Sequence, residues 1–155
     1  MRKYLTHLKY DFNEDIINEL AEQLRNKAKP YKDSRFPNKA ADHWHTLKFE
    51  HEYLQKIMND FKINGSPRFY WQKPNSIIST HVDNGTQCSL NFVLSDNPAP
   101  VTFEDKHDFY YKQCLLNTSL PHSVKNGENE RLLLKISVFD ETYESLAERI
   151  NYEST

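Results

Sequence analysis

The stretch Ser76–Asp83, with the sequence SIISTHVD, decides the fold and the chemistry that we expect. We predict that it forms a β-strand, on which residues two apart project from the same face. The imidazole of His81 and the carboxylate of Asp83 therefore converge. A second imidazole from a distant strand would complete a set of two histidines and one carboxylate, and His122 can supply it. Three such ligands on one side of a metal ion leave its other positions open.

The size and composition of the chain favour one globular unit. At 155 residues we expect a single domain over 1–155, because a second core of useful size would need a longer chain. The mean hydropathy of -0.83 is polar, but nine Tyr, nine Phe and two Trp supply large apolar surfaces for a core. No stretch approaches the ~20 consecutive apolar residues of a membrane span. The basic residues near the N-terminus are not followed by the apolar run of a secretory signal, so we expect a cytoplasmic protein.

The net charge of -2 is spread unevenly along the chain. Residues 1–75 carry 14 Lys and Arg against 10 Asp and Glu, whereas residues 76–155 carry 6 against 12. The positive excess lies at a predicted helix end and in the segment after it, where cations complement the helix dipole. A nucleic-acid partner would need a denser basic patch and is not expected.

Sequence patterns predict helices near both ends of the chain. The first ten residues can form an edge strand. A helix is predicted to begin at the Asp-x-x-Glu motif of residues 11–14 and to run until Pro30 stops it. Residues 31–45 are predicted to be a loop, residues 50–62 a second helix and residues 141–150 a last one.

After Gly65 the pattern changes to short strands separated by turns. The predicted strands are Arg68–Gln72, Ser76–Asp83, Gln87–Leu94, Val101–Glu104, Phe109–Leu116 and Arg131–Phe139. Such regular spacing is typical of a sandwich or barrel. We therefore predict an α+β, mainly β fold. A double-stranded β-helix (jelly roll) over 66–140 would be supported by the substrate-side helices of 1–65 and followed by a helix or tail over 141–155.

Five motifs in the second half resemble the Fe(II)/2-oxoglutarate-dependent oxygenase superfamily. They are the proline turn leading into the strand at 73–81, HVD at 81–83, CSLNF at 88–92, HSV at 122–124 and RLLLKISV at 131–138. The resemblance covers about residues 68–140. It is greatest to the branch that contains prolyl hydroxylases and aspartyl/asparaginyl β-hydroxylases. Many members have Gly where Asn75 stands, and Asn also tolerates a left-handed backbone.

The resemblance implies a role for each candidate site residue. It assigns iron to His81, Asp83 and His122, a donor set that suits Fe(II), although affinity alone would equally accept Zn, Ni or Cu. Arg131 matches the residue that pairs with the far carboxylate of 2-oxoglutarate, a task for which a planar guanidinium is suited. Lys135 shares its strand parity and is the second choice. The assisting hydroxyl could come from Tyr70 or Ser137.

Other polar residues leave more than one interpretation open. Asn91 lies on an otherwise apolar strand and is either a contact to 2-oxoglutarate, as in the aspartyl-hydroxylase-like branch, or a structural hydrogen-bonding residue. His43, His45 and the nearby His51 could form a zinc site, whereas His43, Trp44 and His45 could instead line a substrate entrance. The pair Tyr110-Tyr111 is predicted to serve packing.

The function that follows is hydroxylation of an unactivated C–H bond with O2 and 2-oxoglutarate, ascorbate being an accessory cofactor of this chemistry. The branch favours a prolyl, aspartyl or asparaginyl side chain in a peptide or protein, with a free amino acid as another option. A cupin-like metal-binding or assembly module without turnover is the alternative from another class. The small size also resembles phage-encoded oxygenases, for which the host cytoplasm would be the location.

Overall fold

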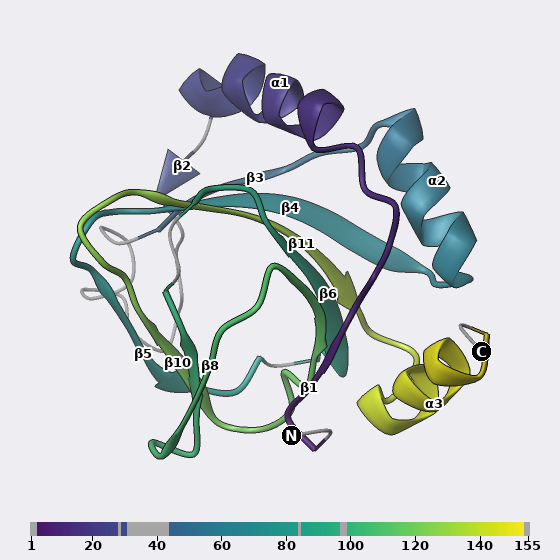
Figure 1. The fold of residues 1–155 in the computed structure, drawn as a ribbon. Coiled ribbons are helices and arrows are strands. Elements are labelled where there is room, and N and C mark those ends of the chain that lie inside the picture. The colour runs from purple at the N-terminus through teal and green to yellow at the C-terminus, as the bar shows by residue number, and fades with distance from the viewer. Residues whose placement is uncertain (1–2, 28, 31–43, 84, 97–98, 154–155) are drawn as a thin grey trace.

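The computed structural model describes residues 3–27, 29–30, 44–83, 85–96 and 99–153, whose strands form two facing antiparallel sheets (Figure 1). The seven-stranded sheet has the order β1 (Leu5–His7), β9 (Gln113–Leu116), β6 (Cys88–Val93), β11 (Arg131–Val138), β4 (Gly65–Gln72), β3 (Trp44–Lys48) and β2 (Lys29–Pro30). The four-stranded sheet has the order β5 (Ile77–His81), β10 (His122–Lys125), β7 (Val101–Phe103) and β8 (His107–Phe109). The predicted double-stranded β-helix is confirmed.

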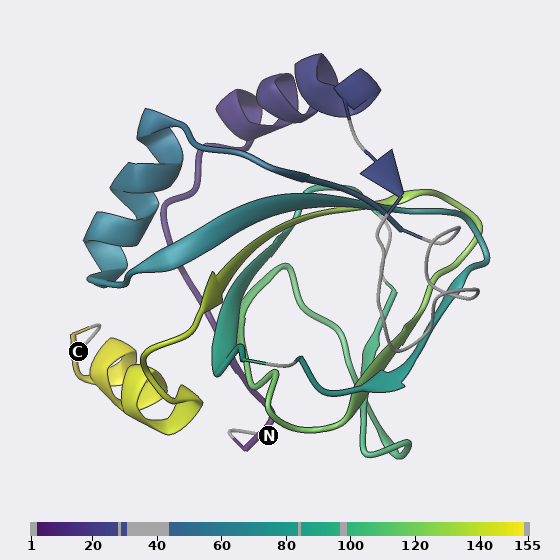
Figure 2. The same ribbon diagram turned by 180° about the vertical axis from the view of Figure 1, so that it is seen from behind.

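Helices cover the outer face of the seven-stranded sheet (Figures 1 and 2). Helices α1 (Glu14–Leu24) and α2 (Glu52–Phe61) lie across it, α1 continues into the short 3-10 helix η1 (Arg25–Lys27), and α3 (Tyr143–Glu153) lies near one end. Alternate residues of the central strands pack beneath them, among them Phe69, Trp71, Leu90, Phe92, Leu134 and Ile136. Because burying each such side chain stabilises the fold by about 1.5–3 kcal/mol, this cluster is the main core.

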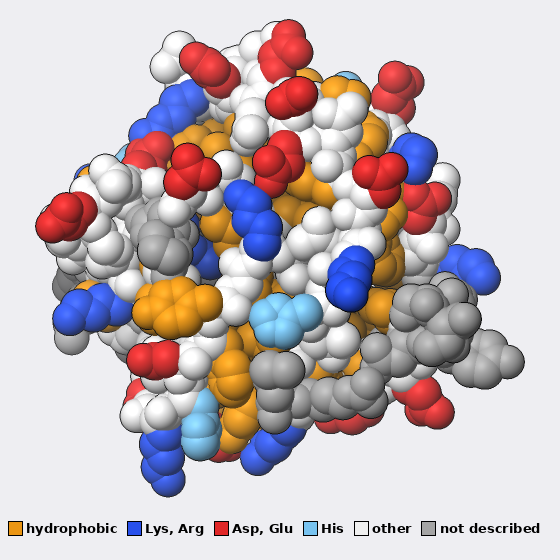
Figure 3. All heavy atoms as spheres, viewed as in Figure 1, with side chains coloured by type: hydrophobic (Ala, Val, Ile, Leu, Met, Phe, Trp, Pro, Cys, Tyr) orange, Lys and Arg blue, Asp and Glu red, His pale blue; other side chains and the backbone are white. Residues whose placement is uncertain are grey.

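Helix α1 shows why the N-terminal segment lies on this face. Ile17, Ala21 and Leu24 recur at helical spacing and are buried against the sheet. The opposite face carries exposed acidic side chains, which gather at the top of the space-filling view (Figure 3). The helix is thus an amphipathic support for the sheet.

The inner face of the seven-stranded sheet carries polar residues instead. Strand pairing sets Lys135 of β11 opposite Asn91 of β6, and Arg131 opposite Gln72 of β4. Because their alternate neighbours pack under the helices, these side chains point toward the four-stranded sheet. Apolar residues of that sheet, including Val101, Phe103 and Val124, form a second cluster with residues of β1 and β9.

Strand β5 contains a bulge that turns His81 inward. Val124 pairs with Ile78 and His122 pairs with His81, so two residues of β5 face only one residue of β10. Ile78 packs into the inner apolar cluster, and simple alternation would therefore point His81 outward. The extra residue shifts the parity, and both histidines reach the interior.

Several predicted elements differ from those observed. The N-cap of α1 is Asn13, whose side chain accepts from the backbone N–H of Ile16, and the α-helix ends at Leu24, before Pro30. Residues 44 and 45 belong to β3 and are not loop, while 31–43 lie outside the described residues. The predicted strand Phe109–Leu116 is divided between β8 and β9, and β10 lies outside the predicted strand ranges, although His122 was expected on a strand.

The edge strand, the second helix and the last helix are confirmed as β1, α2 and α3. Within the described ranges, no helix has the length and apolar character needed to cross a membrane.

Candidate active site

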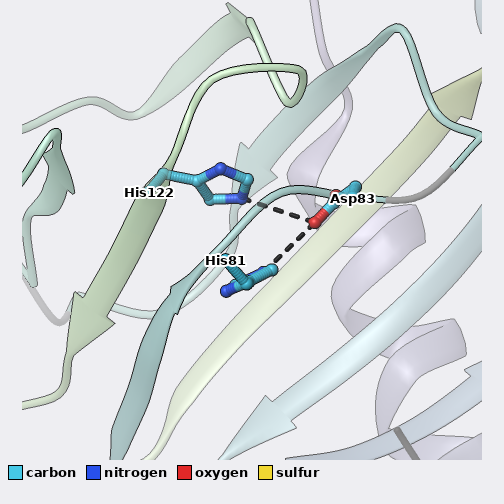
Figure 4. Close-up of side chains that lie close together, drawn as sticks. All are labelled: His81, Asp83 and His122. Carbon is cyan, nitrogen blue, oxygen red and sulfur yellow. Dashed lines mark ion pairs between the residues drawn. The ribbon is translucent and has the colours of Figure 1, made fainter. Parts of the chain in front are cut away.

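His81, Asp83 and His122 come together between the sheets (Figure 4). His81 ends β5, His122 begins β10, and the two rings lie 4.5 Å apart. Asp83 lies in the turn after β5, where its N–H donates to the carbonyl of Thr118. Its Oδ1 is 3.1 Å from Nε2 of His81 and 3.5 Å from Nε2 of His122. The predicted convergence is present, but it comes from the bulge and this turn and not from strand alternation.

The hydrogen bonds of the two imidazoles fix which nitrogen faces Asp83. Nδ1 of His81 lies 2.7 Å from the carbonyl oxygen of Ser79, and Nδ1 of His122 lies 2.8 Å from that of Leu120. Because a carbonyl oxygen only accepts, each Nδ1 must donate, and the neutral ring then has a lone pair on Nε2. Two such lone pairs and a carboxylate oxygen repel one another unless a cation lies between them. The donor set therefore fits a divalent metal ion held by these three side chains.

Asp83 is held in its anionic form. Burial alone would raise the pKa of this carboxyl group, but the Lys135 ammonium beside it helps to lower the pKa well below its usual value. Nζ of Lys135 lies 2.5 Å from Oδ2, the carboxylate oxygen that the imidazoles do not contact. Lys135 therefore contacts a candidate metal ligand, a position different from that of the far-carboxylate partner considered for it above.

Arg131 is buried on the same inner face with part of its guanidinium unpaired. The residue is 1% exposed, and its Nη2 donates to the hydroxyl oxygen of Tyr111 over 2.9 Å. Its Nε and Nη1 have no hydrogen-bond partner among the described residues. Because a buried cation without its hydrogen bonds is costly, two guanidinium nitrogens without a partner in the described part of the chain indicate a place for an anionic ligand.

Tyr111 links Arg131 to Asn91 through a chain of buried polar groups. Ser89 donates to Oδ1 of Asn91 over 2.7 Å, which directs Nδ2 of Asn91 to the Tyr111 oxygen over 3.0 Å. The Tyr111 oxygen thus accepts from both Asn91 and Arg131, and its own proton remains for another acceptor. Burial raises the pKa of Tyr111, although Arg131 opposes this, so the phenol stays protonated and can donate.

The hydroxyl that contacts Arg131 was missed in the sequence. Tyr111 lies between β8 and β9, where no strand alternation assigns its side chain to a face. Its ring packs against the inner apolar cluster, as predicted, but its hydroxyl also bonds two of the candidate residues, a role that the sequence pattern did not predict. Of the two hydroxyls proposed instead, Tyr70 has its ring 5.8 Å from Nζ of Lys135, and Ser137 lies six residues along β11 from Arg131. A role for either in cosubstrate binding stays a prediction.

The alternative histidine cluster is not assembled among the described residues. His51 caps α2, its Nδ1 accepting from the backbone N–H of Tyr53, and His45 lies on β3 opposite Trp71. His43 is outside the described part of the chain. In that part, one group of three or more His, Cys, Asp or Glu side chains could hold a metal ion, and it consists of His81, Asp83 and His122. Their ligand atoms all lie within 4.8 Å of one another.

Solved structures with the same fold include prolyl hydroxylases. The collagen prolyl hydroxylase of Paramecium bursaria Chlorella virus-1, solved as a 2OG complex, superposes with a TM-score of 0.63 and 12% identity over 87% of this chain and 95% of that one. For a prolyl-4-hydroxylase of Pseudomonas putida the TM-score is 0.67 with 13% identity over 87% and 92%. The DMSP lyase DddQ of Ruegeria pomeroyi gives 0.58 with 11% identity over 88% and 67%.

No family model matches the sequence, and no curated protein is significantly similar to it. What the structural likenesses establish is therefore the fold: the chain has the double-stranded β-helix of these proteins.

Proposed function

We propose that this chain is an Fe(II)- and 2-oxoglutarate-dependent dioxygenase that hydroxylates an unactivated C–H bond. The observation that carries the proposal is the pairing of two incomplete sites on one interior surface. One is the group of His81, Asp83 and His122, whose facing lone pairs need a cation. The other is Arg131, two of whose guanidinium nitrogens have no partner among the described residues and need an anion. A 2-oxo dicarboxylate satisfies both, because it has a chelating end and a distant carboxylate.

The proposed roles follow from these contacts. Fe(II) and 2-oxoglutarate, when bound, supply the O2-dependent oxidation of the C–H bond. His81, Asp83 and His122 would hold the metal through Nε2, Oδ1 and Nε2. Arg131 would grip the far carboxylate, and the Tyr111 hydroxyl would donate to the same group. Phe103 of the inner apolar cluster lies beside the ring of His122, and an apolar neighbour of this kind would help to exclude water from the site.

For the substrate we propose a prolyl, aspartyl or asparaginyl side chain within a peptide or protein. Two of the structures with this fold are prolyl hydroxylases by name, and one of these acts on collagen, which supports a peptide. The substrate can be sought by mass spectrometry. Candidate peptides incubated with the protein, Fe(II) and 2-oxoglutarate should gain a single oxygen atom, and a free amino acid gaining it instead would move the substrate to the other option.

Cosubstrate binding is the first test of the proposed function. The protein loaded with Fe(II) without oxygen should bind 2-oxoglutarate in a calorimetric titration, and it should release succinate when O2 and substrate are added. His81→Ala should abolish both. Arg131→Gln should keep metal binding and weaken 2-oxoglutarate binding, whereas Arg25→Gln, which removes an arginine on the helical side of the sheet, should change neither.

A chain that binds the metal at these residues and yet fails to bind 2-oxoglutarate would contradict the oxygenase proposal. That result would favour a cupin-like module without turnover.

A further inference from the structure

Lys135 contacts Asp83 at the one carboxylate oxygen that the histidines leave free. Its Nζ lies 2.5 Å from Oδ2, while Oδ1 faces His81 and His122. The side chains of Lys135 and Asp83 are only 16% and 13% exposed, so solvent screens this ion pair weakly. The backbone of Lys135 is held in place because β11 pairs on both sides, with Asn91 of β6 and Arg68 of β4 opposite Lys135.

We propose that Lys135 is an internal counter-cation of the metal site, which holds the Asp83 carboxylate in the metal-free protein and competes with a divalent metal for its charge. Lys135 is thus a positioning residue that acts through Asp83. The inference rests on the metal site of the proposed function and adds to it how strongly this chain binds the ion.

The competition follows from the charges. In the metal-free chain the Lys135 ammonium lies beside the Asp83 carboxylate, so the buried anion is already compensated. A divalent ion that binds at Oδ1 enters beside a cation held on the same carboxyl group. The two cations repel one another across a weakly screened distance, which lowers the affinity for the metal.

The geometry has a second consequence for the ligand itself. Because Oδ2 is engaged by Lys135, the carboxylate presents Oδ1 alone to the metal. Ligation through one oxygen keeps a further coordination position open for other ligands. Lys135 therefore lowers the affinity for the metal and keeps a coordination position open.

A lysine that only supported the fold would make the same contact, but its substitution would affect stability differently. If Lys135 only supported the fold, its loss would destabilise the metal-free and the metal-loaded protein alike. If it is a counter-cation, its loss leaves a buried Asp83 carboxylate uncompensated only while the metal is absent. Bound metal would then restore the stability that the substitution removes.

The test uses Co2+, measured by calorimetric titration and by thermal unfolding with and without the ion. We expect Lys135→Met to bind Co2+ at least about tenfold more tightly than the unchanged chain. Its midpoint of unfolding should fall without Co2+ and return close to that of the unchanged chain when Co2+ is in excess. Lys135→Arg keeps the cation and should bind Co2+ within about threefold of the unchanged chain. Lys125→Met, which removes an exposed lysine of β10, is the control for charge alone.

Should Lys135→Met not fold without metal, the double variant Asp83→Asn with Lys135→Met removes both charges and should fold in the absence of Co2+. Unchanged or weaker Co2+ binding by Lys135→Met, or equal loss of stability with and without Co2+, would overturn the inference. A failure of the proposed metal site is a different result. In that case the unchanged chain would bind Co2+ no better than His81→Ala does.

Discussion

Removing the hydroxyl of Tyr111 should damage both the stability of the fold and the binding of 2-oxoglutarate. In Tyr111→Phe, Nη2 of Arg131 and Nδ2 of Asn91 lose the oxygen that they reach over 2.9 Å and 3.0 Å. Each buried donor left without a partner costs about 1–3 kcal/mol, and the charged one lies at the upper end. We therefore expect the free energy of unfolding to fall by about 4–6 kcal/mol. Urea-induced unfolding of the two proteins measures it.

The loss of the Tyr111 hydroxyl should also weaken the binding of 2-oxoglutarate. The phenol orients the guanidinium and has its own proton left for the ligand, so its loss removes one hydrogen bond to a charged group. At about 1.5–3 kcal/mol, this corresponds to a roughly tenfold to hundredfold rise in the dissociation constant of 2-oxoglutarate. Calorimetric titration of the metal-loaded protein measures it.

Tyr110→Phe is the matched control. Tyr110 is the neighbouring residue and is 60% exposed, so removing its hydroxyl should change neither the stability nor the binding of 2-oxoglutarate. Tyr111→Phe protein that binds 2-oxoglutarate as tightly as the unchanged chain would refute the role given to Tyr111, and with it the position of the far carboxylate.

Three further predictions concern the fold. Phe92→Ala, at a 1% exposed residue stacked on Phe12 with 4.5 Å between the ring centroids, should lower the free energy of unfolding by about 3–5 kcal/mol in urea titrations. The hydrogen bond from Arg149 holds the pKa of Glu141 below its usual value, so Glu141 stabilises the fold above its unfolded-state pKa and loses this effect as the pH falls through its folded-state pKa. Glu141→Gln should therefore cost about 1 kcal/mol at neutral pH and nothing in acid, and a cost that persists in acid would contradict the ion-pair explanation. Burial raises the pKa of Cys88 to about 12, so a thiol reagent should label it in the native protein far more slowly than in urea.

Much of the fold could be predicted from local patterns. The alternation of buried and polar residues over Arg131–Val138 is that of a strand with one face under helices, and the apolar spacing in α2 is helical. The limits of the predictions have physical causes as well. The Asp-x-x-Glu motif at 11–14 competes with Asn13, whose side chain caps the helix instead. The strand at 44–48 is stabilised by pairing with β4, a long-range contact without a local signal.

The metal-binding residues of the candidate site could be predicted from the sequence, but the contacts around them could not. His81, Asp83 and His122 were identified by spacing and resemblance, and the structure brings their ligand atoms together. Two of the contacts that matter most come from pairing and loop geometry. Lys135 reaches Asp83 across 52 residues of sequence, and Tyr111 reaches Arg131 from an irregular segment. The periodicity of the sequence predicts neither of these two contacts.

The bulge in β5 means that the inward direction of His81 does not require regular alternation between it and Ile78. Deleting Ser79 or Thr80 would remove no apolar contact of the inner cluster and would leave the composition of the site intact. It would also keep His81 on the inner face, because His81 would then lie two residues after Ile78 and β5 would pair with β10 without a bulge. Loss of one residue at this point would thus leave the candidate metal ligand on the inner face of a regular strand.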